Sequence, residues 1–255
     1  MPSATSSSGT AVSSTQSVRR LEEIAYEFWR APEVDELDGW RLRFGYGVSG
    51  RANSVWPNAH GGIGLEEKLQ RAERWYAERG VPTLFQLTVA ARPAGLADAL
   101  LARGYEWGKA PVSVETADLH EVVERSSGDA QLSDEPDAAW VELWTGTRGF
   151  DRLDVARQIL TGSPGRTVFA HVGDVAVGRA VVVGEWLGIT SMATAPAARR
   201  RGHARSIVHT LAQWGWELGA RRALLQVEQT NVAARELYAR VGFVASHAYR
   251  YCIQR

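Results

Sequence analysis

The stretch APAARRRGHARSIV, residues 195–208, runs from a proline through an arginine cluster and a glycine into an apolar helical pattern. The cluster has four arginines, at Arg199, Arg200, Arg201 and Arg205. A helix N-terminus carries a partial positive charge, so a cation there costs about 0.3–1 kcal/mol unless something offsets it. A bound anion is the simplest compensation, because free helical N–H groups and guanidinium forks both bind phosphate. Gly202 and Ala204 leave the backbone accessible to such a ligand.

A solvated surface is the ordinary alternative for a run of arginines. The fixed order of strand, proline, arginines, glycine and helix favours the anion site instead. Two other phosphate motifs are missing from the sequence: a glycine loop followed by Lys-Ser/Thr, and Gly-x-Gly-x-x-Gly with an acidic residue about 20 positions later. The sequence therefore argues against nucleotide hydrolysis and dinucleotide redox chemistry.

The segments around this stretch alternate between strand and helix patterns. Strands are predicted over TVFAHV (167–172), VAVGRAVVV (175–183), LGITSMAT (187–194), ALLQVE (223–228) and residues 243–253. Helical spacing follows residue 202 and recurs over 232–241. This order predicts the α/β class, a mixed sheet with helices on both faces.

Composition excludes several classes of protein. The 255 residues include 29 Lys+Arg and 29 Asp+Glu, so the chain lacks the surplus positive charge of a general nucleic-acid binder. It has no apolar run long enough to cross a membrane. The single cysteine, Cys252, cannot form an internal disulfide and reads as a small buried hydrophobe, and no Cys/His cluster has metal-ligand spacing. We expect a cytoplasmic protein without a metal.

The chain divides into four parts. We expect a disordered Ser/Thr-rich tail over 1–18, an N-terminal domain over 19–118, a polar linker over 119–128 and a second domain over 129–255. The helix that opens the second domain is expected to be capped by Ser133 or Asp134.

The two halves also look related. Gly104 and Gly242, each just before a final strand, are 138 residues apart. Pro57 and Pro196, each closing a strand before a long helix, are 139 residues apart. The common register indicates a duplication.

Two motifs resemble a known family. RRRGHA (199–204) is similar to the acyl-CoA pyrophosphate loop of the GNAT N-acetyltransferases, and NVAARELYARVGF (231–243) resembles their downstream helix. The whole chain is similar to the tandem type, two GNAT-like repeats with a degenerate N-terminal repeat. The resemblance implies transfer of an acetyl group from acetyl-CoA to an amine, without a metal.

The resemblance also implies a donor site between the strands that end near Thr194 and Glu228. Main-chain groups of one strand would hold the pantetheine arm, and the loop would hold the pyrophosphate. The implied donor-binding residues are Met192, Ala193, Thr194, Arg199, Arg200, Arg201, Gly202, His203, Ala204, Arg205 and Asn231. Either Arg199 or Arg200 could reach the 3′-phosphate, and the sequence does not distinguish them.

Two residues are the catalytic candidates. Tyr238 would be the general acid toward the departing thiolate, with core packing as its alternative. Glu228 is the first choice for the general base, with a solvated strand end as its alternative. Further bases remain open: Glu185, Asp151, His171 or a chain of waters. Asn231 is equally explained as a helix N-cap.

The first half lacks the implied donor site. In the 138-residue register, Arg199, Gly202, Asn231 and Tyr238 fall on Gly61, Gly64, Pro93 and Leu100. We therefore expect the first half to bind no acyl-CoA and to help shape the acceptor pocket. We assign no functional role to the first-half residues Trp40, Arg51, Asn53 and Trp56.

The acceptor is predicted to be a small-molecule or amino-acid-like amine. The alternatives are a protein N-terminus or lysine, a role in small-thiol biosynthesis, and a noncatalytic acyl-CoA-binding module. A nucleic-acid-binding module and a membrane partner are disfavoured by the charge balance and hydropathy, and the oligomeric state is open.

Overall fold

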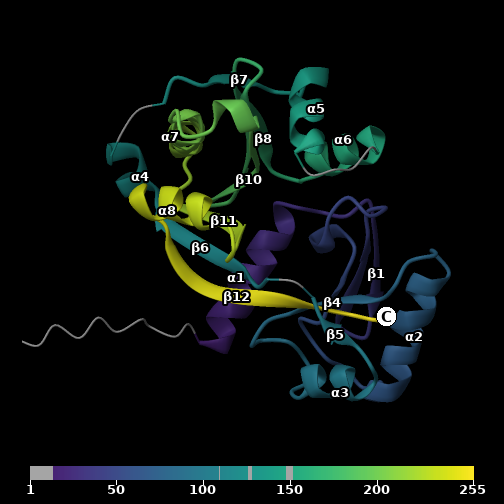
Figure 1. The fold of residues 1–255 in the computed structure, drawn as a ribbon. Coiled ribbons are helices and arrows are strands. Elements are labelled where there is room, and N and C mark those ends of the chain that lie inside the picture. Colours follow the sequence, from purple (N-terminus) through teal and green to yellow (C-terminus); the bar gives the residue numbers. More distant parts are fainter. Residues whose placement is uncertain (1–13, 109, 126–127, 148–151) are drawn as a thin grey trace, which may run out of the picture.

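The computed structural model of the protein describes residues 14–108, 110–125, 128–147 and 152–255 (Figure 1). The α-helices are α1 (Thr15–Glu27), α2 (Leu65–Ala77), α3 (Leu96–Ala102), α4 (Leu119–Arg125), α5 (Ala138–Gly146), α6 (Leu153–Thr161), α7 (His203–Glu217) and α8 (Val232–Arg240). Short 3₁₀ turns are η1 (Gly50–Ala52) and η2 (Pro196–Ala198).

The strands alternate with these helices along the chain. They are β1 (Glu33–Leu37), β2 (Trp40–Phe44), β3 (Val55–Trp56), β4 (Leu84–Leu87), β5 (Glu106–Trp107), β6 (Val112–Asp118), β7 (Gln131–Ser133), β8 (Arg166–Val172), β9 (Ala176–Val183), β10 (Trp186–Thr194), β11 (Arg222–Glu228) and β12 (Val244–Ile253). They form one mixed sheet in the order β1-β2-β3-β4-β12-β6-β11-β10-β9-β8-β7, with β5 beside β12. The predicted fold class is confirmed.

The later part of each half has the same order of main elements. In the first, α2 connects β3 to the parallel strand β4. In the second, α7 connects β10 to the parallel strand β11. Each half then continues through a short helix, α3 or α8, toward a long strand, β6 or β12, and in the first half the short strand β5 comes between them. This shared connectivity supports the predicted duplication.

The long final strands of the halves are exchanged. β6, from the first half, pairs antiparallel with β11 of the second half. β12, from the second half, pairs with β4 and β5 of the first half through its last residues and with β6 through its earlier ones. Figure 1 shows β12 running from the second half into the first. The sheet is therefore continuous, and each half completes the other.

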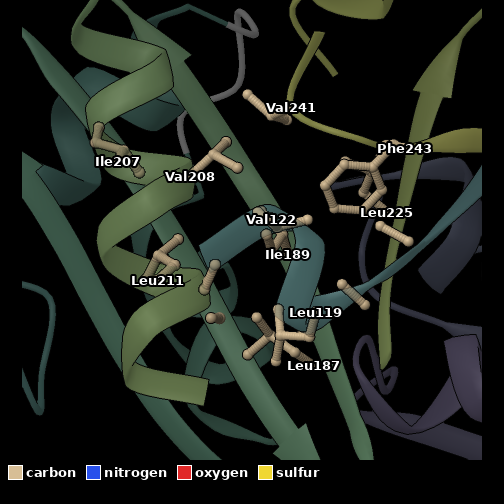
Figure 2. Packing of buried hydrophobic residues seen from close by; sticks show 14 of the residues in the cluster. Leu119, Val122, Leu187, Ile189, Ile207, Val208, Leu211, Leu225, Val241 and Phe243 are labelled. Atoms are coloured by element: carbon tan, nitrogen blue, oxygen red, sulfur yellow. The ribbon is translucent and has the colours of Figure 1, made fainter. Parts of the chain in front are cut away.

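One face of the second half is covered by α4, α7 and α8. Ile207, Val208 and Leu211 on α7 pack onto Leu187 and Ile189 of β10 (Figure 2). All five side chains are buried, because their helical or alternating spacing places them on the facing surfaces of the two elements. This packing fixes where α7 begins relative to β10.

The opposite face is covered by α1, α5 and α6, with Phe28 at the end of α1 as its central contact. A Cβ on Gly188 of β10 would lie 2.2 Å from the Phe28 ring, so glycine is required for that ring to approach the strand this closely. The Phe28 carbonyl also accepts hydrogen bonds from Ser163 Oγ and Arg179 Nη1. These contacts attach α1 to the second half.

Three sequence predictions need correction. Order begins before Arg19, because Ser14 accepts a hydrogen bond from Ser17 N–H and caps α1 from Thr15; residues 1–13 of the predicted tail lie outside the described residues. The segment 119–128 is not a linker: it forms α4 over 119–125, whose Leu119 and Val122 side chains are buried in the core with residues of α7, while 126–127 lie outside the described residues. The cap of α5 is Asp137.

Cys252 on β12 is fully buried in the first-half core, as predicted. Burial raises the pKa of its thiol, which keeps it in the uncharged form.

Candidate active site

Strands β10 and β11 separate along part of their length. They pair in parallel from Trp186 with Arg222 to Ile189 with Leu225. Beyond that point β10 continues to Thr194 beside β9 alone, and β11 continues beside β6 alone. The main-chain groups of each strand that would face the other are therefore available to a third partner.

A β-bulge lies in β10 where the separation begins. The register with β9 shifts between Thr190 and Ala193, and Ser191 has a φ of +55°. Leu187 and Ile189 face α7 before the bulge, and Met192 does so after it, so the bulge exchanges the two faces of the strand. Such an outlier is found mainly where function needs it.

Helix α7 begins beside the end of β10 with unbonded N–H groups. Its first hydrogen bond runs from Ser206 N–H to the Gly202 carbonyl, at 3.0 Å. The N–H groups of His203, Ala204 and Arg205 therefore have no acceptor within the helix. Gly202, the N-cap, has a φ of +87° and contributes no capping side chain.

The four predicted arginines surround this helix end, and all four are exposed. Among the described residues, no carboxylate lies within 4.0 Å of Arg199, Arg200, Arg201 or Arg205. Arg200 has a φ of +66°, a left-handed conformation that is uncommon for arginine. Among the described residues, the only side-chain hydrogen bond found for these four arginines is a long one, from Arg199 Nε to the Thr194 carbonyl at 3.5 Å. The site is therefore open and positively charged, as an anion site requires.

The corresponding loop of the first half is closed by the protein itself. The Asp38 carboxylate accepts hydrogen bonds from the N–H groups of Gly61, Gly62 and Ile63, at 3.0–3.2 Å. Lys68 Nζ lies 3.1 Å from the same carboxylate. A Cβ on Gly61 would lie 1.9 Å from Asp38 Oδ1, so glycine is required there. An internal anion thus occupies the position that remains open before α7.

Comparison with known proteins decides the family. Residues 15–252 match the family model described as "Probable histone acetyltransferase Rv0428c C-terminal". The chain belongs to this family. An uncharacterized N-acetyltransferase of Bacillus subtilis, YobR, is 29% identical over 248 residues, 91% of this chain and 98% of its own. The probable histone acetyltransferase Rv0428c of Mycobacterium tuberculosis is 29% identical over 252 residues, 93% of this chain and 74% of its own.

Solved structures show the same fold. A GCN5-related N-acetyltransferase from Kribbella flavida superposes with a TM-score of 0.65 at 15% identity, over 97% of this chain and 96% of its own. A tandem GNAT protein from the clavulanic acid biosynthesis pathway gives a TM-score of 0.59 at 14% identity, over 92% and 87%. The protein is a GNAT N-acetyltransferase, which confirms the family that the sequence predicted.

The structure places the other predicted site residues as follows. Asn231 caps α8, because its Oδ1 accepts a hydrogen bond from Ala234 N–H at 3.2 Å. Tyr238 is buried in the core against Phe243, at 6.0 Å between ring centroids. Glu228 is exposed at the end of β11, beyond its last pair with β10. The structure therefore shows Asn231 as a helix cap and Tyr238 as a core residue, the two alternatives given above. The catalytic roles of Tyr238 and Glu228 stay predictions.

The alternative bases differ in position. Glu185 precedes β10 at the end far from Thr194, about 30 Å away along an extended strand, so it does not belong to the site. His171 lies on β8, in the row that contains Val177 of β9 and Ala193 of β10, about 10 Å from the latter. Asp151 lies outside the described residues.

A buried polar group that the sequence analysis missed lies beside the separated strands. Glu22 on α1 accepts a hydrogen bond from Gln86 Nε2 at 2.8 Å and lies 2.8 Å from His247 Nε2. The sequence gives no signal for this group, because its members come from α1, β4 and β12.

The described residues contain no helix with the length and apolar character needed to cross a membrane. Within the same residues, no group of three His, Cys, Asp or Glu side chains is arranged to hold a metal ion.

Proposed function

We propose that this N-acetyltransferase transfers the acetyl group of acetyl-CoA directly to the amine of a small-molecule, amino-acid-like acceptor. One observation carries the donor part of the proposal: the start of α7 presents free N–H groups and unpaired arginines next to the separated ends of β10 and β11. A diphosphate fits this site because both kinds of donor bind phosphate oxygens strongly.

The chain's own groups divide the work of acyl transfer. N–H groups from Arg200 to Arg205 would bind the pyrophosphate, with Arg199 or Arg200 adding a side-chain contact. Main-chain groups of Met192, Ala193 and Thr194, following the bulge, would hold the pantetheine arm and polarise the thioester carbonyl. Acetyl-CoA supplies the activated acetyl group.

Glu228 and Tyr238 are the proposed proton-transfer residues, and they lie on opposite sides of β11. Leu225 and Val227 face the core beneath α8, so Gln226 and Glu228 face the opposite side of the sheet. We assign Glu228 to removal of a proton from the acceptor amine and Tyr238 to protonation of the departing thiolate. Asn231 would add a polar contact through the amide nitrogen that its capping bond leaves available.

Calorimetry tests the donor site. We expect heat on titration of the intact protein with coenzyme A, and an affinity at least about tenfold lower when Arg199, Arg200 and Arg201 are all replaced by glutamine. Arg240→Gln is the matched control, because Arg240 is an exposed arginine at the far end of α8, paired with Glu236. No heat at millimolar coenzyme A with the unaltered protein would refute the proposal.

Release of the coenzyme A thiol tests the acceptor. The panel contains amino acids, polyamines, and lysine-containing peptides such as a histone tail, since a relative is named a probable histone acetyltransferase. Turnover with a small amine supports the proposal. Turnover with peptides alone would replace it with a protein acceptor.

A further inference from the structure

The side chain of Ser191 is buried without a hydrogen-bond partner. Only 5% of the residue is exposed, and its Oγ has no donor or acceptor among the described residues. The preceding Thr190 differs, because its Oγ1 accepts a hydrogen bond from Arg179 Nη1 at 3.2 Å. A buried hydroxyl that has lost its contact with water and gained no partner destabilises the fold. Ser191 therefore has an unused hydrogen-bond donor inside the protein.

The backbone of Ser191 carries a second cost. Its φ of +55° lies in the left-handed region, which glycine adopts freely and serine adopts rarely. A glycine at position 191 would remove both the backbone strain and the unpartnered hydroxyl. A residue that lowers stability in two ways is expected mainly where it has a function.

Ser191 is the additional residue of the bulge in β10. The register with β9 shifts at this point, so that Ser191 and Met192 lie opposite the single residue Gly178. A Cβ on Gly178 would lie 2.5 Å from Met192 Sδ, which shows that Met192 covers this glycine. Ser191 is consequently the residue that the ladder between β9 and β10 leaves unpaired.

The bulge lies at the buried end of the separated strands. The last pair between β10 and β11 joins Ile189 to Leu225, two residues before Ser191. Beyond Ser191 the strand becomes partly exposed, from Met192 to Thr194, on its way toward the start of α7. A donor with its pyrophosphate at α7 and its arm along β10 would have its reacting end deepest in the protein. That end lies beside Ser191.

We propose that Ser191 Oγ donates a hydrogen bond to the carbonyl oxygen of the acetyl thioester and stabilises the negative charge that develops there. This inference rests on the proposed function, because it concerns the same donor. The carbonyl oxygen only accepts hydrogen bonds, so the serine O–H is a suitable partner.

The hydrogen bond acts at one stage of acetyl transfer. The amine nitrogen forms a bond with the thioester carbon, and the carbonyl electron pair moves onto the oxygen that Ser191 contacts. Return of this pair breaks the carbon–sulfur bond. The thiolate leaves and takes a proton from Tyr238, and the nitrogen loses its proton to Glu228, as assigned above. Ser191 gives up no proton in this sequence.

Two substitutions separate the hydroxyl from the backbone conformation. Ser191→Gly should raise the melting temperature of the free protein, because both costs disappear, and should lower kcat about 100-fold with the KM for acetyl-CoA within threefold. Ser191→Ala keeps the strained φ, lacks the hydroxyl and should lose as much kcat. Thiol release with acetyl-CoA and the best amine of the panel above measures both constants.

A matched control is Ser133→Gly. Ser133 lies on the edge strand β7, and its hydroxyl already donates to the Glu135 carbonyl at 2.9 Å. This variant should leave kcat unchanged. Calorimetry adds a second comparison: Ser191→Gly should bind coenzyme A within twofold of the unaltered protein, because coenzyme A has no acetyl carbonyl.

The results that overturn the inference differ from those that overturn the proposed function. If Ser191→Gly transfers acetyl as fast as the unaltered protein, the inference fails and the proposed function stands. A fall in coenzyme A affinity that matches the fall in kcat, or a melting temperature that falls with kcat, also overturns it, since either indicates a structural role. If the unaltered protein binds no coenzyme A, the proposed function fails and the inference fails with it. Should Ser191→Gly not fold, Ser191→Ala decides by kcat and coenzyme A affinity.

Discussion

Gly178 on β9 lies beneath the first turns of α7, so Gly178→Ala probes how tightly the donor site is built. A Cβ at this position would lie 2.5 Å from Met192 Sδ and 2.6 Å from Ile207 Cγ2. Ordinary contacts begin at 3.4 Å, so each neighbour must retreat by about 0.8–0.9 Å. The Met192 side chain can rotate away, whereas Ile207 is fully buried on a helix that would have to move.

The expected cost follows from this overlap. Adding a methyl group to a well-packed core destabilises by about 1–3 kcal/mol, and the one rigid neighbour favours a value near 2 kcal/mol. For a chain of this length, that corresponds to a melting temperature lower by about 4–8 °C. Because Ile207 and Met192 flank the proposed donor site, we also expect coenzyme A affinity to fall about tenfold.

Thermal unfolding and calorimetry with coenzyme A measure both effects. Gly146→Ala is the matched control: Gly146 is the exposed last residue of α5, with nothing within 4 Å of an added Cβ, and alanine there should stabilise by about 0.5–1 kcal/mol. If Gly178→Ala unfolds at the temperature of the unaltered protein and binds coenzyme A equally well, the contact between β9 and α7 does not position the site.

Three further changes test separate parts of the structure. Tyr238→Phe should lower kcat by about 100-fold or more with little change in coenzyme A affinity, and an unchanged kcat would remove its role as general acid. Asp38→Asn should lower the free energy of unfolding at pH 7, because buried Lys68 loses its carboxylate. Burial opposes ionisation of Asp38, but the hydrogen bonds from Lys68 and the loop N–H groups outweigh it and lower the pKa of the carboxyl. The difference in free energy of unfolding between the unaltered protein and Asp38→Asn should therefore be fully present above about pH 4 and disappear as the pH falls through the lowered pKa. Urea titrations at both ends of that range measure this difference, and a value that does not change with pH would contradict the prediction. Residues 129–255 alone should be insoluble or unfolded, which light scattering and circular dichroism would show, and a folded, fully active fragment would contradict the role of the first half.

The parts of the site that depend on local sequence could be predicted. The arginine cluster and Gly202 mark the start of α7 because helix ends impose their own charge and backbone requirements. The 138-residue register also placed Gly64 opposite Gly202, and each is the N-cap of the corresponding helix. These features are encoded within a few residues, so one sequence was enough to find them.

The parts that depend on distant segments could not be predicted. Asp38 closes the first-half loop from more than twenty positions away, and nothing near Gly61 indicates it. The bulge at Ser191 leaves one trace, the change of apolar positions between Ile189 and Met192, which is too short to separate from irregular alternation. Helix α4 could not be predicted because most of its seven residues are polar. Only two of its side chains are buried, which is too few to give a clear apolar helical pattern.

The exchange of β6 and β12 explains why a half without a donor site is nevertheless part of the enzyme. β6 pairs with all seven residues of β11, including Gln226 and Glu228, so the strand that carries the proposed base is bounded on one side by the first half. The carboxylate of Asp38 already accepts the loop N–H groups of the first half, which favours the second half as the donor site of the proposed reaction. We therefore propose that the first half contributes to the acceptor side.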